Sequence, residues 1–221
     1  MEKIMNDDKL EKHVEFETKY RTEPDKLHQF ISIVQEIDQP HEFVYAQGPD
    51  FYYTLPDLSF ARYRKAENDK KAWVTFKEKP EGASNNIYRT EVNWRVDNTK
   101  KETIFKGLEL QGYKYNFSIW KMCHIYKFKD ATLVFYTVRD YVDNSLDHFI
   151  EIEVDEETIH NLTREEAMGV IRKYEEFLTP LGITYRNRLN KSLFEMYFRK
   201  IYEDNPSKSE GIVGNTVVGS K

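Results

Sequence analysis

The sequence predicts an α+β protein in which about eight antiparallel strands form a closed barrel with helices packed outside. Three observations lead to this prediction. Extended segments are numerous and helical segments are few, charged and apolar residues alternate along the extended segments, and the charged residues of different segments fall into a common pattern. A sheet with many strands and few covering helices is expected to curl and close on itself.

The first half of the chain alternates between one helix and several strands. Val14–Tyr20 alternates in polarity and predicts the first strand. Glu23–Ile37 predicts a helix, because its apolar residues form one stripe and a proline lies in its first turn. Further strands are predicted at Phe43–Gln47, Phe51–Tyr53, Ser59–Lys65, Ala72–Lys77 and Tyr88–Val96.

The second half adds three helices and the remaining strands. Thr99–Leu110 predicts a weaker helix that Gly112 closes. Thr163 begins the next helix with a capping box, in which Glu166 is the partner. The last helix is predicted at Asn190–Tyr202. Three strands lie between these helices, at Phe117–Phe128, Thr132–Asp140 and Phe149–Val154.

Length and composition indicate one domain. We expect residues 1–203 to form it, and 204–221, where Pro, Ser, Gly and Lys accumulate, to be a disordered tail. The single cysteine, Cys123, excludes an internal disulfide bond and favours a reducing compartment. The N-terminus lacks an apolar signal segment and no stretch is long enough to span a bilayer, so a soluble cytoplasmic protein without membrane contact is expected. The net charge of −5 argues against a nucleic-acid partner.

The charged residues of several strands share one face, since residues two apart along a strand point the same way. Acids gather on the first and last strands, and bases on those between. In chain order, the residues on this face are Glu15, Glu17 and Lys19, then Arg62 and Arg64, then Arg89, Glu91, the uncharged Asn93 and Arg95, then Glu151, Glu153 and Asp155. One strand at a time, this describes an ordinary amphipathic sheet with its charges in water. If the barrel closes with its apolar face outward, the charges line the lumen instead.

A lumen that carries both signs of charge would suit a complex of a metal ion and a polyanion. Magnesium and manganese prefer oxygen ligands, and magnesium is usually held by one or two carboxylates together with substrate phosphates. Arginine guanidinium groups match phosphate oxygens and keep their charge.

These residues also occur in a recognisable order. Glu15-Phe16-Glu17-Thr18-Lys19 is an E-x-E-x-K strand that resembles the signature of the CYTH, or triphosphate tunnel metalloenzyme, superfamily. Further segments resemble other strands of that family in the same order. They are Asp50–Thr54, Arg62-Tyr63-Arg64, Thr75-Phe76-Lys77, Arg89-Thr90-Glu91, Lys121 with Asp140, and Leu146–Glu153.

The resemblance implies a division of roles among these side chains. Metal ligands, for Mg²⁺ or Mn²⁺, would be Glu15, Glu17, Asp140, Glu151 and Glu153. Phosphate-binding residues would be Lys19, Arg62, Arg64, Lys77, Arg89 and Lys121. Tyr52 and Lys77 would form a catalytic pair in which the lysine is a general base. The alternative is that Tyr52 belongs to the core and Lys77 only anchors phosphate.

The chain departs from the family pattern at four positions. Thr54 replaces an aspartate, Asn93 a frequent glutamate, Cys123 an arginine and Asp147 a glycine. Cys123 removes one phosphate contact, for which Lys127 or Arg139 could substitute.

The resemblance implies hydrolysis of a small-molecule triphosphate: inorganic triphosphate, a nucleoside triphosphate or thiamine triphosphate. Class IV adenylyl cyclase activity is the main alternative. A non-catalytic module that binds polyphosphate or a nucleotide is another. An RNA 5′-triphosphatase is disfavoured by the acidic net charge. A homodimer is compatible with the sequence.

Overall fold

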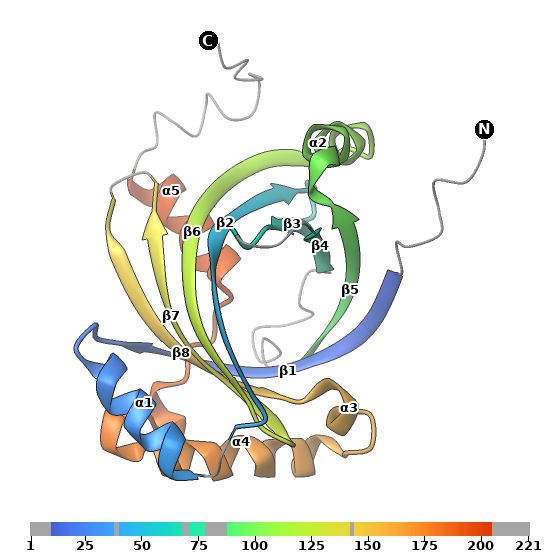
Figure 1. Ribbon diagram of the computed structural model, residues 1–221. Coiled ribbons are helices and arrows are strands. Elements are labelled where there is room, and N and C mark those ends of the chain that lie inside the picture. The colour runs from blue at the N-terminus through green and yellow to red at the C-terminus, as the bar shows by residue number, and fades with distance from the viewer. Residues whose placement is uncertain (1–9, 38–39, 68–70, 78–87, 142–143, 205–221) are drawn as a thin grey trace.

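The computed structural model describes residues 10–37, 40–67, 71–77, 88–141 and 144–204 (Figure 1). Within a few elements only the backbone is described. Eight antiparallel strands curl into a barrel (Figure 1). They are β1 (Leu10–Thr22), β2 (Glu42–Thr54), β3 (Phe60–Arg64), β4 (Lys71–Lys77), β5 (Tyr88–Asp97), β6 (Lys114–Lys127), β7 (Ala131–Asp140) and β8 (Leu146–Val154).

The ring of strand pairings closes through β1. The order is β1-β5-β4-β3-β2-β6-β7-β8, and β1 pairs with both ends of this series. Its first half, from Leu10 to Phe16, pairs with β5, and its second half, from Glu17 to Thr22, pairs with β8. A barrel of about eight strands has an interior just wide enough to be filled by side chains or to hold one small ligand.

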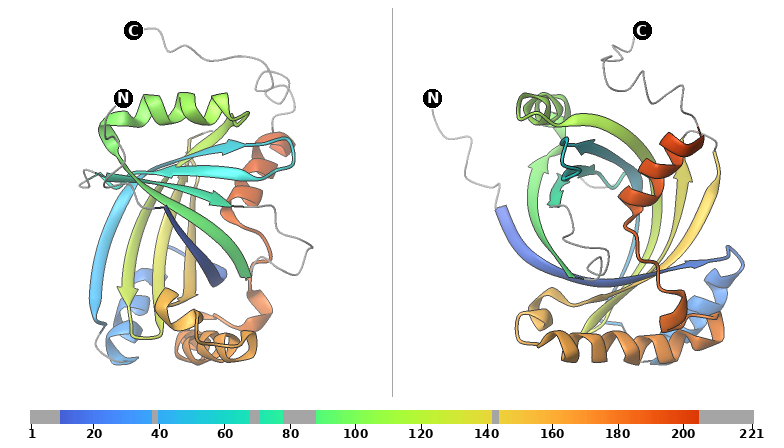
Figure 2. Two further views of the ribbon diagram at one scale, coloured as in Figure 1. Left: turned by 90° about the vertical axis from the view of Figure 1, so that its right-hand side faces the viewer. Right: turned by 180° about the vertical axis from the view of Figure 1, so that it is seen from behind.

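The helices pack around this barrel. They are α1 (Lys26–Ile37), α2 (Lys101–Leu110), α3 (Glu156–Ile159), α4 (Arg164–Leu178) and α5 (Leu193–Asp204). Three lie together on one side, α1, α3 and α4, and α2 lies on the opposite side (Figure 1). The fifth helix, α5, crosses one open end of the barrel (Figure 2, right). Among the described residues, no helix has both the length and the hydrophobicity of a membrane span.

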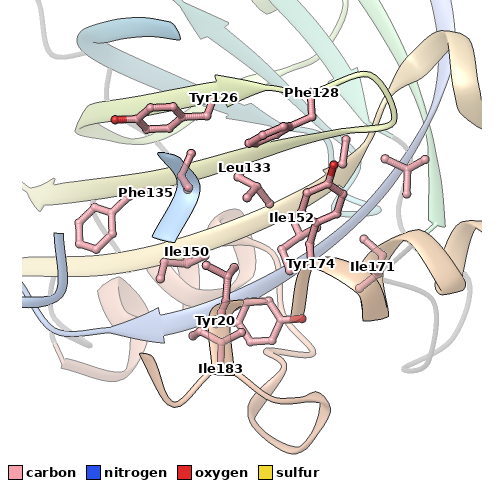
Figure 3. Close-up of a cluster of buried hydrophobic side chains, with 14 of the residues drawn as sticks. Tyr20, Tyr126, Phe128, Leu133, Phe135, Ile150, Ile152, Ile171, Tyr174 and Ile183 are labelled. Carbon is pink, nitrogen blue, oxygen red and sulfur yellow. The ribbon is translucent and has the colours of Figure 1, made fainter. Parts of the chain in front are cut away.

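Two apolar clusters cover the outer face of the barrel, as the alternation predicts. One joins β1, β6, β7 and β8 to α1 and α4, and includes Tyr20, Leu133, Ile150 and Ile171 (Figure 3). The other lies under α2, where Ile104 and Leu108 pack on Val74 and Val96. Burial of these residues stabilises the fold by about 25 cal/mol for each Å² of apolar surface.

A third apolar cluster lies inside the barrel, and the expectation of a lumen lined by charges is therefore only partly right. Ile119 and Phe149 share the inward faces of β6 and β8 with Lys121 and Glu151, which line the pocket described below. Leu193 and Phe194 of α5 join this cluster. Part of the interior is thus an ordinary packed core, and the charges occupy another part.

Element boundaries differ from the predictions in a few places. The predicted strands Phe43–Gln47 and Phe51–Tyr53 are one continuous strand, β2, because Gly48 and Pro49 remain extended and pair with β6. The capping box of Thr163 and Glu166 is confirmed. The last helix begins at Leu193 rather than Asn190 and runs to Asp204, and the predicted tail beyond it lies outside the described residues.

Gly48 allows the close approach of two segments, and we predict that Gly48→Ala is destabilising. An added Cβ would overlap the backbone carbonyl oxygen of Lys65. Forcing the segments apart should lower the free energy of unfolding by about 1–3 kcal/mol. The measurement is urea unfolding. Gly169→Ala is the control, since a Cβ at this helical position in α4 meets nothing within 4 Å; it should leave stability unchanged or raise it. Equal stabilities for the two variants would contradict the prediction.

Candidate active site in the barrel lumen

A pocket of about 210 Å³ lies in the charged part of the barrel. It is lined by ten of the residues that the sequence singled out: Glu15, Glu17, Lys19, Tyr52, Arg62, Arg64, Lys77, Lys121, Glu151 and Glu153. The remaining lining residues are Phe60, Glu91, Asn93, Ser192, Leu193 and Phe194. Side chains from seven strands and one helix therefore meet in a single small space.

Closure of the barrel at β1 brings the acids together. In the β1–β8 register, Glu17 lies opposite Glu153 and Lys19 lies opposite Glu151. These residues are far apart in the sequence, and alternation alone places them only on the same face of their own strands. The antiparallel pairing then puts the glutamates of the first and last strands side by side.

Two lysines partly neutralise these glutamates. The Nζ of Lys19 lies 2.9 Å from Glu17 and 3.3 Å from Glu151. The Nζ of Lys77 lies 2.7 Å from Glu15 and also pairs with Glu91. Because all four of these ion pairs are largely out of water, each carboxylate depends on its lysine for compensation.

Negative charge nevertheless remains in excess around β8. Burial, followed by the neighbouring charges of Glu15, Glu151 and Glu17, raises the pKa of Glu153 well above its ordinary value. Burial and the charge of Glu17 likewise raise the pKa of Glu151. These carboxyls are crowded in a way that a bound cation would relieve.

The arginines on β3 are held differently. Arg64 donates two hydrogen bonds to Asp50, at 2.8 and 2.6 Å. Burial alone would raise the pKa of Asp50, but the charge and hydrogen bonds of Arg64 lower it. Arg62 donates to Thr75 at 3.2 Å, and its buried Nε has no hydrogen-bond partner among the described residues. Arg62 therefore retains a donor for a ligand.

Lys121 lies deeper in the wall. Burial lowers the pKa of this lysine, and its Nζ lies 3.8 Å from the centre of the Tyr136 ring. Cys123, two residues further along β6, is buried beside it, and burial raises the pKa of the thiol. Cys123 is therefore a buried small side chain of this wall.

Tyr52 and Lys77 both line the pocket, but each of them has contacts with other residues. Tyr52 stacks on Phe117, with ring centres 4.5 Å apart, and burial raises its pKa to about 12. Lys77 pairs with Glu15 and Glu91. The catalytic pair of Tyr52 and Lys77 stays a prediction.

Two predicted site residues are not placed in the pocket. Asp140 is buried but does not belong to the lining, so its role as a metal ligand stays a prediction. The backbone of Arg89 lies opposite Glu15, whereas its side chain is outside the described part of the structure. The suggested substitutes for Cys123 lie elsewhere: Lys127 pairs with Glu42 at 2.6 Å, and exposed Arg139 donates to Asn144 at 3.0 Å.

Two kinds of lining residue escaped the sequence-based assignment. Glu91 shares a strand face with Arg89 and belongs to the quoted Arg89-Thr90-Glu91 motif, so the alternation contains the signal for it. Ser192 and Phe194 were assigned no role, and Phe60 had no such signal. Phe194 comes from α5 and stacks on Phe60 with ring centres 4.4 Å apart, a contact that depends on where the helix packs.

The chemistry of the acids fits Mg²⁺ or Mn²⁺, although their arrangement shows no complete site. Four glutamates supply the oxygen ligands that these ions prefer. Among the described residues, however, no three acidic, histidine or cysteine side chains already form a group that could hold a metal ion. Glu15, Glu17 and Glu151 are instead engaged with lysines.

Comparison with known proteins identifies solved structures that have a similar fold. No protein-family model and no curated protein matches the sequence. A conserved hypothetical protein from Pyrococcus furiosus is 25% identical with a TM-score of 0.62, and the match covers 82% of this chain and 98% of that one. A candidate adenylate cyclase from Vibrio parahaemolyticus is 19% identical with a TM-score of 0.59, and the match covers 84% of this chain and 98% of that one.

A candidate adenylate cyclase from Bacillus halodurans has a TM-score of 0.57 at 17% identity, over 85% of this chain and 98% of that one. These similarities show a shared fold, which is the kind of fold that the resemblance to the CYTH superfamily implies. A chain in the Schizosaccharomyces pombe Mediator head module is also similar, with a TM-score of 0.54 at 10% identity, over 76% of this chain and 95% of that one. The shared fold therefore does not by itself establish an activity, which depends on the residues in the lumen.

The crowding around Glu153 leads to a prediction about stability. A carboxyl whose pKa is raised by folding contributes stability below its unfolded pKa, and that stability is lost as the pH rises through the folded pKa. Glu153→Gln should therefore be more stable than wild type at about pH 8, by roughly 1 kcal/mol or about 2–4 °C in melting temperature, and the difference should shrink toward about pH 5.

Thermal unfolding at several pH values without divalent cations measures this difference. Exposed Glu36→Gln is the control and should not change the pH profile. A Glu153→Gln protein less stable than wild type at every pH would show that Glu153 is a structural ion-pair partner instead.

Proposed function

We propose that this protein is a metal-dependent hydrolase of a triphosphate compound that binds in the barrel lumen. The observation that carries the proposal is the balance of charge around the pocket. Five carboxylates and five cationic side chains line it: Glu15, Glu17, Glu91, Glu151 and Glu153, with Lys19, Arg62, Arg64, Lys77 and Lys121.

A balanced lining favours a ligand that itself carries both signs. A site for a polyanion alone would need no cluster of acids, and a site for a cation alone would need no arginines. A triphosphate with its divalent cation satisfies both sets at once. Phosphoryl transfer depends mainly on positioning and charge neutralisation, which such a lining supplies.

The size of the pocket favours a short phosphate chain. A volume of about 210 Å³ is below the roughly 300–1,000 Å³ typical of pockets for drug-sized molecules. The stacked rings of Phe60 and Phe194 border it. Adenylyl cyclase activity is the second candidate, because of the two similar candidate cyclases. It would require a further site for adenine and ribose that positions the 3′-hydroxyl.

On binding of the metal–triphosphate complex, the charged side chains of the pocket would leave their ion pairs with one another and contact the ligand instead. Glu15, Glu17, Glu151 and Glu153 would hold the cation, with Asp140 as a further candidate, and Lys19 and Lys77 would turn to phosphate oxygens. When bound, Mg²⁺ or Mn²⁺ would neutralise phosphate charge and polarise the scissile bond. Arg62 and Arg64 would bind phosphate through guanidinium N–H groups, and Lys121 and Arg89 would add charge.

Lys77 has two competing roles in this scheme. Its carboxylate partners favour the ammonium form, which suits a phosphate anchor. A general base would have to lose its proton, and this becomes easier once Glu15 binds the cation and other positive groups surround the lysine. Tyr52 would border the same phosphates.

The substrate assay is the main test. We expect the purified protein with Mg²⁺ or Mn²⁺ to release phosphate from tripolyphosphate faster than from ATP, because the pocket favours a compact substrate. Glu15→Ala and Glu17→Ala should reduce turnover by about a hundredfold or more, as loss of an essential electrostatic group does. Products are identified by ion chromatography, and circular dichroism checks the fold of each variant.

Other outcomes point to the alternatives. Cyclic AMP with pyrophosphate from ATP would replace the hydrolase by a cyclase. Tight binding of tripolyphosphate without turnover would indicate a non-catalytic module. Full activity of both glutamate variants would contradict the assignment of the metal ligands.

The guanidinium group of Arg62 on β3 gives a second prediction. Arg62→Ala should raise KM for tripolyphosphate and lower kcat, and Arg62→Lys should recover only part of the loss. A lysine keeps the charge but cannot donate two parallel hydrogen bonds to phosphate. Steady-state kinetics measures both constants. Equal kinetics of wild type and Arg62→Lys would show that only the charge of Arg62 matters.

A further inference from the structure

A second concave site lies outside the barrel, in a cleft beside α2. Its volume is about 350 Å³, which exceeds that of the lumen pocket and falls within the range of sites for small organic molecules. We call it the α2 cleft. It is lined by Phe76, Trp94, Val96, Ile104, Leu108 and Tyr113, together with Lys100, Thr103, Gly107 and Gln111.

The walls of the α2 cleft are apolar and partly aromatic. Phe76 of β4 and Tyr113 meet edge to face, with ring centres 6.1 Å apart. Trp94 adds a third ring from the neighbouring strand β5, and Ile104 and Leu108 of α2 supply aliphatic surface. Rings and aliphatic groups arranged in this way suit a flat apolar body.

Gly107 leaves part of this space open. It lies on the same face of α2 as Ile104 and Gln111, which are three residues before it and four after it. A Cβ at Gly107 would meet nothing within 4 Å. Glycine inside a helix is less stable than alanine by roughly 0.5–1 kcal/mol. No contact requires glycine here, and a side chain would reduce the cleft.

Apart from the Tyr113 hydroxyl and the Trp94 indole N–H, the polar groups of the cleft lie at the start and end of α2. Lys100 supplies one positive charge, which also interacts electrostatically with the Asp97 carboxylate. Thr103 and Gln111 add groups that donate hydrogen bonds. An apolar cleft with one cation at its edge is complementary to an apolar molecule that carries one negative charge.

We propose that the α2 cleft binds a small organic anion that has a flat apolar body and a carboxylate or sulfonate group. The apolar body would lie among Phe76, Trp94 and Tyr113, and the anionic group would face Lys100. The cleft is concave and small, which suits such a molecule better than a second protein chain.

The cleft and the lumen use opposite faces of the same strands. Phe76 is the neighbour of Lys77 in β4, and Trp94 is the neighbour of Asn93 in β5. Adjacent residues of a strand point to opposite sides of the sheet. A ligand in the α2 cleft therefore does not compete directly with a phosphate in the lumen, and the two sites can be tested separately.

Two fluorescent probes test the proposal on the full chain. Anilinonaphthalene sulfonate has an apolar ring body and one negative charge, and N-phenylnaphthylamine has the same body without the charge. We expect both to bind at one site for each chain, and the sulfonate to bind more tightly. Excess tripolyphosphate should displace neither.

Three variants locate the bound probe. Gly107→Leu should weaken both probes by on the order of tenfold, because the new side chain fills the cleft. Gly169→Leu is the matched control, since it also replaces a helical glycine in open space but lies in α4. Lys100→Gln should weaken the sulfonate by about two- to fivefold, as loss of an exposed ion pair does, and leave the neutral probe unchanged.

Each contrary result overturns a defined part of the proposal. Displacement by tripolyphosphate would place the probe in the lumen. Equal effects of Gly107→Leu and Gly169→Leu would exclude the α2 cleft. A sulfonate affinity that does not respond to Lys100→Gln would exclude an anionic ligand. Unchanged near-ultraviolet circular dichroism of each variant shows that the fold is intact.

Discussion

The compensation of charge at β1 is the constraint on which the rest of this structure depends. Glu15, Glu17 and Lys19 face the lumen from the strand that closes the barrel. Closure therefore buries carboxylates from two strands against one another, and it is tolerable only because Lys19 and Lys77 lie among them. Unpaired charge buried in this way would destabilise the fold by several kcal/mol. The same lysines and glutamates are then available to a ligand that carries both signs.

The position of α5 depends on a second buried network, at the other edge of the same strand. Arg188 donates two hydrogen bonds to Glu175, both at 2.6 Å, and Tyr20 donates to the same carboxylate. The backbone N–H of Leu189 donates to Lys19 at 2.7 Å. These bonds lead the chain to Ser192 and into α5, and Ser192, Leu193 and Phe194 complete the pocket.

Asp147, which replaces a glycine of the family pattern, also helps to hold α5 against the barrel. It accepts hydrogen bonds from Arg21 and from Tyr197 of α5, so this departure strengthens the attachment of the helix to the barrel. The crowded acids of the site lower the stability of the fold. The packing of α5 and of the apolar cluster inside the barrel offsets this loss. Crowded charge that destabilises a fold is typical of functional sites.

The sequence by itself determined which residues face which side, because the side-chain period of a strand is a local property. This period predicted the eight-stranded α+β fold and, together with the family resemblance, ten residues of the pocket, and a separate local motif predicted the capping box of Thr163. Only the tertiary structure decided which faces meet. The pairing of Lys19 with Glu151, the apolar cluster inside the lumen and the contact of Phe194 with Phe60 all depend on barrel closure and helix packing. These are contacts between segments distant in the chain, and no local pattern specifies them.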